Sequence, residues 1–149
     1  MNLFGMLDLS ASALTAERQR AEVVASNMAN AETTRTPEGG PYHRQLVVFR
    51  SQHMQRFPLV LASLSGNIFT GRAARGVQID KVIADASPVI RRFQPGHPDA
   101  DAKGYVAYPN INPVEEMTDL LGAVRSYQLN ASAVQAAKTM ITESLDLLR

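Results

Sequence analysis

The segment "GHPDAD" is the part of the sequence whose residue types and spacing come closest to a chemical site. It places the imidazole of His97 and the carboxylates of Asp99 and Asp101 at alternate positions. Such groups bind divalent cations, and a bound cation can activate water for hydrolysis. A fourth convincing ligand is missing, and a Pro-Gly pair typical of a turn precedes the segment. We therefore expect a structural loop without a metal, with a metal-binding or hydrolytic protein using residues 95–112 as the alternative.

The other candidates for chemistry fail on residue type. The segment "GNIFTG" has the glycine spacing of a phosphate-binding loop, but Arg72 and Ala73 follow where Lys and Ser or Thr are required. No spacing around His43 or His53 suggests a Ser-His-Asp grouping. The chain has no cysteine, which excludes disulfides and thiolate zinc sites. We expect no catalytic residue, no cofactor and no small-molecule substrate.

Charge and length exclude further classes of partner. The 15 basic and 14 acidic residues leave a net charge of +1, and no basic run suggests binding to nucleic acid. The most apolar window, residues 57–69, is shorter than the roughly 20 residues that a membrane-spanning helix needs. With 149 residues, of which 45% are hydrophobic, the chain has the size and composition of one globular domain.

The strongest periodic signal lies in the C-terminal third and predicts a helix over residues 114–149. One heptad series there comprises Met117, Val124, Ala131, Lys138 and Leu145. A second series comprises Leu120, Tyr127, Val134, Ile141 and Leu148. At the other end, residues 3–29 form a second predicted helix, with Asn30 as a left-handed terminator. Its seam is rich in alanine and follows alternating steps of four and three through Leu7, Ala11, Leu14, Arg18, Ala21, Ala25 and Met28.

Between the two helices the composition favours strands and turns. The segments "QLVVF", "GVQID", "PVIRRF" and "GYVAY" are predicted strands, separated by Gly and Pro. The fold class is therefore α+β. A helix over 114–149 would be roughly 50 Å long, whereas a compact chain of this size is about 40 Å across. We expect an elongated molecule in which residues 1–30 and 114–149 pair as an antiparallel, coiled-coil-like rod, while 31–113 form a joint and a β-rich outer region.

Both predicted helices contain long stretches without charge. Residues 126–137 carry no charged side chain, and neither do residues 23–31. Small neutral residues on all sides of a helix solubilise it poorly but suit packing against several neighbours. We therefore expect the helices to be buried in an assembly of subunits. The predicted interface comprises Leu7, Leu14, Ala21, Val24, Ala25, Met28, Met117, Leu120, Val124, Tyr127, Ala131, Val134, Ile141 and Leu145.

Three stretches carry a family resemblance. They are "SALTAERQRAEVVASNMANAETTRTPEGGPY", "PGHPDADAKGYVAYPNIN" and "EEMTDLLGAVRSYQLNASAVQAAKTM". On these residues, about half of the chain, the sequence resembles the bacterial flagellar rod proteins, and most of all those of the proximal rod. Another rod-type axial subunit is the alternative within this class.

The resemblance implies a structural subunit of the flagellar basal body. Such a subunit is exported unfolded by the type III apparatus, without a cleaved signal peptide, and polymerises helically in the periplasm into a shaft that transmits torque. The implied partners are further copies of the chain, other rod proteins, the membrane ring, rod-adaptor components and the export apparatus. The terminal helices would line the inner tube, with the β-rich part outside.

The segment after the N-terminal helix is then a joint. Thr36 to Gly39 fit a tight turn with Pro37 at its second position, and a strand is expected to begin near Tyr42. The hydroxyl and amide groups of the joint, together with those of residues 95–112 (the distal loop), are candidates for contacts with neighbouring subunits. These residues are Asn27, Asn30, Thr33, Thr34, Pro37, Gly39, Gly40, Pro41, Tyr42, His97, Pro98, Asp99, Tyr105, Pro109 and Asn110.

Overall fold

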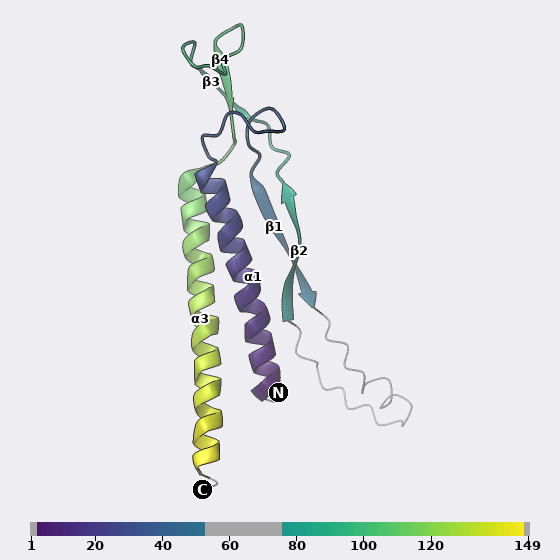
Figure 1. Cartoon of the computed structure of the whole chain (residues 1–149), viewed down its shortest axis with the longest axis vertical. Helices are drawn as coiled ribbons and strands as arrows, with labels where there is room; N and C mark the ends of the chain where they lie inside the picture. The colour runs from purple at the N-terminus through teal and green to yellow at the C-terminus, as the bar shows by residue number, and fades with distance from the viewer. Residues whose placement is uncertain (1–2, 53–75, 148–149) are drawn as a thin grey trace, which may run out of the picture.

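A computed structural model of the chain describes residues 3–52 and 76–147. Its elements are α1 (Leu3–Ala29), β1 (Gln45–Gln52), β2 (Gly76–Ala84), β3 (Ile90–Phe93), β4 (Tyr105–Tyr108) and α3 (Pro113–Asp146). Figure 1 shows an elongated molecule in which α1 and α3 lie side by side in opposite directions, with the strands between them in sequence. The predicted α+β fold with paired terminal helices is confirmed. The segment "GNIFTG" lies outside the described residues.

The start of α3 follows from local sequence. The Oδ1 atom of Asn112 accepts a hydrogen bond from the backbone N–H of Val114 at 3.1 Å, which caps the helix. Pro113 occupies the first turn, where its missing N–H costs nothing. Glu115 and Glu116 follow in the same turn, where negative charge complements the helix dipole.

The strands form two separate antiparallel hairpins. In the first, β1 pairs with β2, so that Gln45 lies opposite Ala84 and Gln52 opposite Gly76. This hairpin packs along α1 on the side away from α3, which leaves α1 as the middle layer of the molecule (Figure 1). The second hairpin, β3–β4, lies beyond the end of the helix pair (Figure 1). Among the described elements, α3 contacts only α1.

The core is thin and is made largely of small side chains. The buried apolar residues in the described part of the chain are Ala16, Val24, Val106, Tyr108, Ile111, Ala123 and Ala137. Alanine at the contact between α1 and α3 lets the two backbones approach closely. Many larger apolar side chains remain exposed on α3, among them Leu121 and Leu129.

The buried seam of α3 differs from the predicted one in one of its two heptad series. Its solvent side carries the predicted series Met117, Val124, Ala131, Lys138 and Leu145. The buried positions are instead Glu116, Ala123 and Ala137. Of the second series, Leu120, Val134 and Ile141 are half-buried, Tyr127 is exposed, and Leu148 lies outside the described residues. A heptad pattern permits a neighbouring series either three or four residues away. Small side chains lie at the contact with α1 because the two helices pack closely, whereas the prediction was based on the larger apolar side chains.

The predicted seam of α1 is displaced as well. The predicted residues alternate between half-buried and exposed, and the buried side chains are Ser10, Ala16, Val24 and Asn27. The reason is that α1 packs on two sides, against α3 and against the β1–β2 hairpin. Ser12 provides one contact with the hairpin, because its hydroxyl accepts a hydrogen bond from the backbone N–H of Val77 at 3.2 Å.

The joint is partly as predicted. The backbone N–H of Gly39 donates to the carbonyl of Thr36 at 3.0 Å, which closes the expected turn. Gly39 and Gly40 have φ angles of +90° and +81°, a region that side chains disfavour. The prediction for Asn30 is wrong, because no described residue other than glycine has a positive φ. Strand β1 also begins at Gln45, later than the predicted start near Tyr42.

Gly104 is the glycine at which a side chain would be tolerated least. Its φ is +78°, and a Cβ atom there would lie 2.9 Å from Cε2 of Phe93 and 3.2 Å from Cβ of Pro95. We predict that Gly104→Ala destabilises the folded chain by about 1–3 kcal/mol, since it adds both backbone strain and a clash. Chemical denaturation followed by circular dichroism measures this difference.

The matched control is Gly122→Ala in α3. A Cβ atom at Gly122 would meet nothing within 4 Å. Because alanine is the better helix former, this variant should gain about 0.5–1 kcal/mol. Equal stability of the Gly104→Ala chain and the parent chain would show that the β3–β4 hairpin absorbs the extra methyl group.

Candidate functional site

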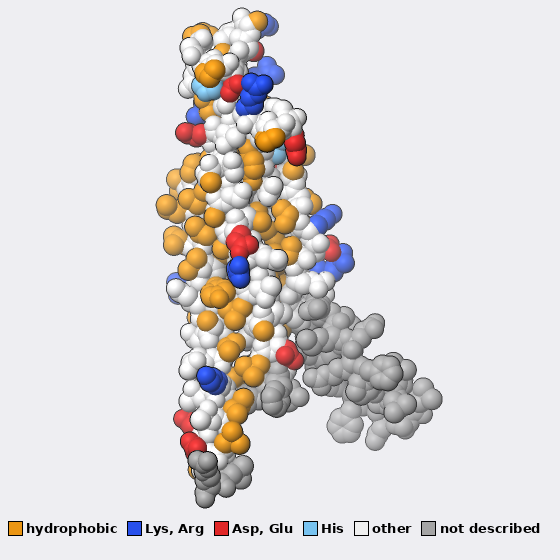
Figure 2. Space-filling model, viewed as in Figure 1, with side chains coloured by type: hydrophobic (Ala, Val, Ile, Leu, Met, Phe, Trp, Pro, Cys, Tyr) orange, Lys and Arg blue, Asp and Glu red, His pale blue; other side chains and the backbone are white. Residues whose placement is uncertain are grey.

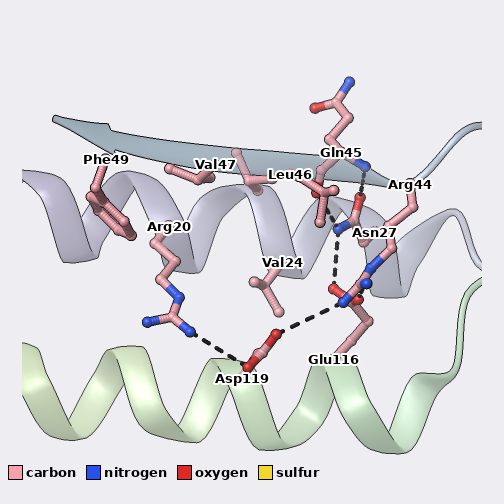
Figure 3. Close-up of a pocket in the computed structure, with 11 residues that line it drawn as sticks. Arg20, Val24, Asn27, Arg44, Gln45, Leu46, Val47, Phe49, Glu116 and Asp119 are labelled. Carbon is pink, nitrogen blue, oxygen red and sulfur yellow. Dashed lines mark hydrogen bonds and ion pairs between the residues drawn. The ribbon is translucent and has the colours of Figure 1, made fainter. Parts of the chain in front are cut away.

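A buried polar cluster joins α1, α3 and the start of β1, and Asn27 is its centre. The side chain of Asn27 is 1% exposed. Its Nδ2 atom donates to the carbonyl of Gln45 at 2.9 Å and to Oε2 of Glu116 at 3.0 Å. Its Oδ1 atom accepts from the backbone N–H of Gln45 at 2.9 Å and from the hydroxyl of Tyr42 at 3.1 Å. Every hydrogen-bonding position of the amide is therefore used within the chain, and Figure 3 shows the bonds to Gln45 and Glu116.

Glu116 is the buried charge of this cluster. It is 1% exposed, and its Oε1 atom accepts a charge-assisted hydrogen bond from Nε of Arg44. Arg44 also lies 3.8 Å from the carboxylate of Asp119, which in turn lies 3.4 Å from Nη2 of Arg20. Figure 3 shows these side chains around a cavity of about 230 Å³ between the two helices and β1. A buried carboxylate is tolerated only with partners of this kind, so the cluster fixes how the three elements meet.

A second feature is an open, mostly apolar groove between α1 and α3. Its volume is about 420 Å³. It is lined by Glu17, Arg18, Ala21, Glu22, Ala25, Leu120, Ala123, Val124 and Tyr127. Five of these residues belong to the predicted subunit interface, and they come from both helices. Figure 2 shows apolar side chains spread over the helical body, with charges few and scattered.

The distal loop uses its chemical groups for internal bonds. Asp99 accepts a hydrogen bond from the hydroxyl of Thr34 at 2.8 Å and lies 3.8 Å from Nη1 of Arg35, which links the loop to the joint. Nδ1 of His97 accepts a hydrogen bond from the backbone N–H of Asp99 at 3.1 Å, and its ring lies edge-on to that of Tyr108. Within residues 3–52 and 76–147, no three His, Asp or Glu side chains are grouped to hold a metal ion.

Two aspartates at turns have perturbed acidities. The backbone N–H groups of Tyr105 and Lys103 donate to Asp101, and these hydrogen bonds lower the pKa of its carboxyl. The hydroxyl and backbone N–H of Ser87 do the same for the pKa of Asp85. In both cases the charged form is stabilised by a turn, which is a structural role.

The predicted interface residues differ widely in exposure. Val24 is buried. Half-buried are Leu7, Leu14, Ala21, Met28, Leu120, Val134 and Ile141. Exposed are Ala25, Met117, Val124, Tyr127, Ala131 and Leu145. The exposed members are available to neighbours, whereas the buried and half-buried ones lie within the single chain.

The predicted joint residues are divided in a similar way. Asn27 and Pro109 are buried. Half-buried are Asn30, Thr33, Thr34, Pro41, Tyr42, His97 and Asp99. Exposed are Pro37, Gly39, Gly40, Pro98, Tyr105 and Asn110. The amide of Asn27 and the hydroxyls of Thr33 and Thr34 form bonds inside the chain, although neighbouring subunits were their expected partners.

Comparison with known families finds two matches, one at each end of the chain. Residues 7–35 match the family described as "Flagella basal body rod protein". Residues 102–147 match the family described as "Flagellar basal body rod FlgEFG protein C-terminal". The matched segments contain most of α1 with the first residues of the joint, and β4 with α3; of these elements, α1 and α3 pack together.

Similar proteins match over the full length. The flagellar basal-body rod protein FlgC of Bacillus subtilis is 40% identical, and the match covers 99% of both chains. FlgC of Borreliella burgdorferi is 36% identical over 100% of this chain and 99% of its own. The chain belongs to the FlgC family of flagellar basal-body rod proteins. The FlgC protein of Salmonella typhimurium, at 36% identity, covers 99% of this chain and 98% of its own.

Sequence reasoning missed the charged half of the cluster in this FlgC-family chain. Asn27 was singled out, but Arg44, Glu116 and Asp119 were not grouped with it. One signal could have found Glu116, which lies four residues before Leu120 and seven before Ala123, on the stripe of α3 that faces α1. A carboxylate on an inward stripe requires a buried partner.

We predict that Glu116→Ala destabilises the chain by about 2–4 kcal/mol. The substitution leaves the guanidinium of Arg44 without its nearest carboxylate and removes the acceptor of one Asn27 amide proton. Guanidinium unfolding followed by the helical circular dichroism signal measures the loss.

Glu115→Ala is the matched control. Glu115 is exposed and shares the first turn of α3, so it experiences the same helix dipole without the buried contacts. We expect a loss under about 1 kcal/mol. Equal losses for the two variants would contradict a structural role for the cluster.

Proposed function

We propose that this chain is a structural subunit of the flagellar basal-body rod, that it belongs to the proximal rod, and that it polymerises helically into a shaft that transmits torque. The full-length similarity to FlgC proteins supports the assignment to the rod. The proposal gives the chain a mechanical role and no catalytic one. Its proposed partners are further copies of the chain and other rod proteins. The membrane ring, the rod adaptor and the export apparatus are proposed as further partners.

The groove between α1 and α3 is the observation that carries the packing part of the proposal. Val124 and Tyr127, which line the groove, are 41% and 42% exposed although they are large and apolar. Outside the groove, Leu121 and Leu129 on α3 are more than 60% exposed. Exposed apolar surface of this extent marks a site of protein–protein contact. We propose that residues 1–30 and 114–149 act as one helical unit whose groove receives a helix of a neighbouring subunit.

The place of assembly is a further part of the proposal. We propose that the chain reaches the periplasmic rod through the type III apparatus. No helix among the described residues combines the length and the apolar character that crossing a membrane requires.

Val124→Asp tests the packing proposal. Val124 is exposed in the single chain, so the substitution should change the free energy of unfolding by no more than about 0.5 kcal/mol. In an assembled rod it would bury a carboxylate without a partner, at a cost of several kcal/mol in every subunit. We predict export without rod growth, measured as loss of swimming in soft agar and loss of basal bodies in purified preparations.

Gln128→Asp is the control, because it adds the same charge to an exposed residue of α3 that does not line the groove. It should retain swimming. His97→Ala examines the alternative in which the distal loop carries chemistry, and it should also swim. A swimming Val124→Asp strain together with a non-swimming His97→Ala strain would overturn the proposed function.

A further inference from the structure

The two ends of the elongated molecule differ in chemistry. The β3–β4 hairpin forms one end, and the last turns of α3, which extend beyond the start of α1, form the other (Figure 1). Among residues 90–108 there are three basic side chains, Arg91, Arg92 and Lys103. None of them takes part in an ion pair with another described residue.

One face of the β3–β4 hairpin is an exposed surface of aromatic and basic groups. Phe93 lies opposite Tyr105 and Arg91 opposite Ala107, so these four side chains share a face. Phe93 is 63% exposed and Tyr105 43%, and their rings meet edge-on at 5.4 Å between centroids. On the opposite face, Val106 and Tyr108 of β4 are buried, whereas Ile90 and Arg92 of β3 are exposed. Exposed aromatic and arginine side chains together are typical of the centre of a protein interface.

The carboxylates near this face are already engaged. Asp99 is bound by Thr34 and Arg35, and Asp101 accepts hydrogen bonds from the backbone of its own turn. The electrostatic influence of Arg91 reaches Asp101, but no ion pair forms between them. Arg91 therefore remains available to a carboxylate from outside, whereas Arg92, on the opposite face, lies over the ring of Tyr108.

The end of α3 offers the complementary chemistry. Met140, Glu143 and Leu147 lie three and four residues apart, so they share a stripe, with Asp146 beside it. Met140 is 53% exposed and Leu147 88%, and the last turn of the helix contains no basic residue. The carbonyl groups at a helix C-terminus add partial negative charge, which favours a cationic partner. Arg149, outside the described residues, is the one basic residue that follows Lys138 in the sequence.

We propose that the aromatic and basic face of the β3–β4 hairpin binds the C-terminal end of α3 of a second copy of this chain, end to end along the long axis. Arg91 faces Glu143 and Asp146 of the second copy, while Phe93 and Tyr105 cover Met140 and Leu147. This inference rests on the proposed function and names one contact surface for it.

The opposite location of the two surfaces explains the choice of occupant. Surfaces at opposite ends of one molecule cannot satisfy each other within that molecule (Figure 1). A contact between two different surfaces of identical chains does not close on itself, and it therefore extends into a helical filament. Charge complementarity favours this pairing over tip to tip, which would bring arginines together, and over tail to tail, which would bring carboxylates together.

Cross-linking between full-length chains tests the pairing. Because the sequence has no cysteine, only the introduced thiols can react with the cross-linker. One chain carries Ala102→Cys in the distal loop and the other Ser144→Cys near the end of α3. The two are mixed in equal amounts with a short thiol-reactive cross-linker. We expect the mixed dimer to exceed the share that random pairing gives. Either like dimer in excess, or a random distribution, would overturn the proposal. Ser132→Cys, at an exposed site in the middle of α3, replaces Ser144→Cys in the control mixture.

A charge exchange between the two chains tests the ionic part. Arg91→Glu on the chain with Ala102→Cys should lower the yield of mixed dimer about fivefold, and Glu143→Lys on the other chain should restore it. Arg125→Glu, an exposed charge change on α3 away from both ends, should leave the yield unchanged. An unchanged yield with Arg91→Glu, or no recovery with Glu143→Lys, would overturn the proposed contact. Either failure leaves the groove test with Val124→Asp intact, so the two proposals are distinguished.

Discussion

The buried carboxylate of Glu116 is the constraint on which the arrangement of the molecule depends. A charge with 1% exposure is stable only where cationic and amide partners meet it, and here they come from α1 and from the residue before β1. Asn27 has no spare hydrogen-bonding position, so it holds Glu116 and Gln45 in fixed directions. Apolar packing alone would let α1 and α3 slide or rotate, whereas this cluster accepts one register. The same register determines which alanine residues meet further along the helices.

The thin core and the exposed apolar surface have one explanation in this arrangement. Ala123 and Ala137 are fully buried, so the helices are close, but such small side chains bury little apolar area. The larger apolar side chains, such as Val124 and Leu121, lie on the outside. A chain that completes its burial by packing against neighbours can afford this distribution. The proposed role as a rod subunit accounts for it, because the assembly then supplies the burial that the single chain lacks.

Much of the fold follows from local sequence signals. The helix over residues 3–29 ends where the hydrophobic periodicity of the sequence ends. Pro113 and its acidic neighbours mark the start of α3. The turn from Thr36 to Gly39 is predicted by Pro37 and Gly39. One of the two heptad series of α3 was predicted one residue away from the buried positions, because small side chains rather than large apolar ones occupy the close contact. The cluster around Glu116 was missed because its members lie 72 and 89 residues from their partners, and no local pattern contains that pairing.

The layer order of the molecule has a mechanical consequence. Because α3 contacts α1 alone among the described elements, a twisting load applied to α3 has two routes to the β1–β2 hairpin. One route runs through the packed length of α1, and the other through the link from Glu116 to Arg44 at the start of β1. The first is spread over the length of the helix, whereas the second passes through a single ion pair. In the proposed shaft, a torque on α3 would therefore reach the hairpin partly through one buried ion pair.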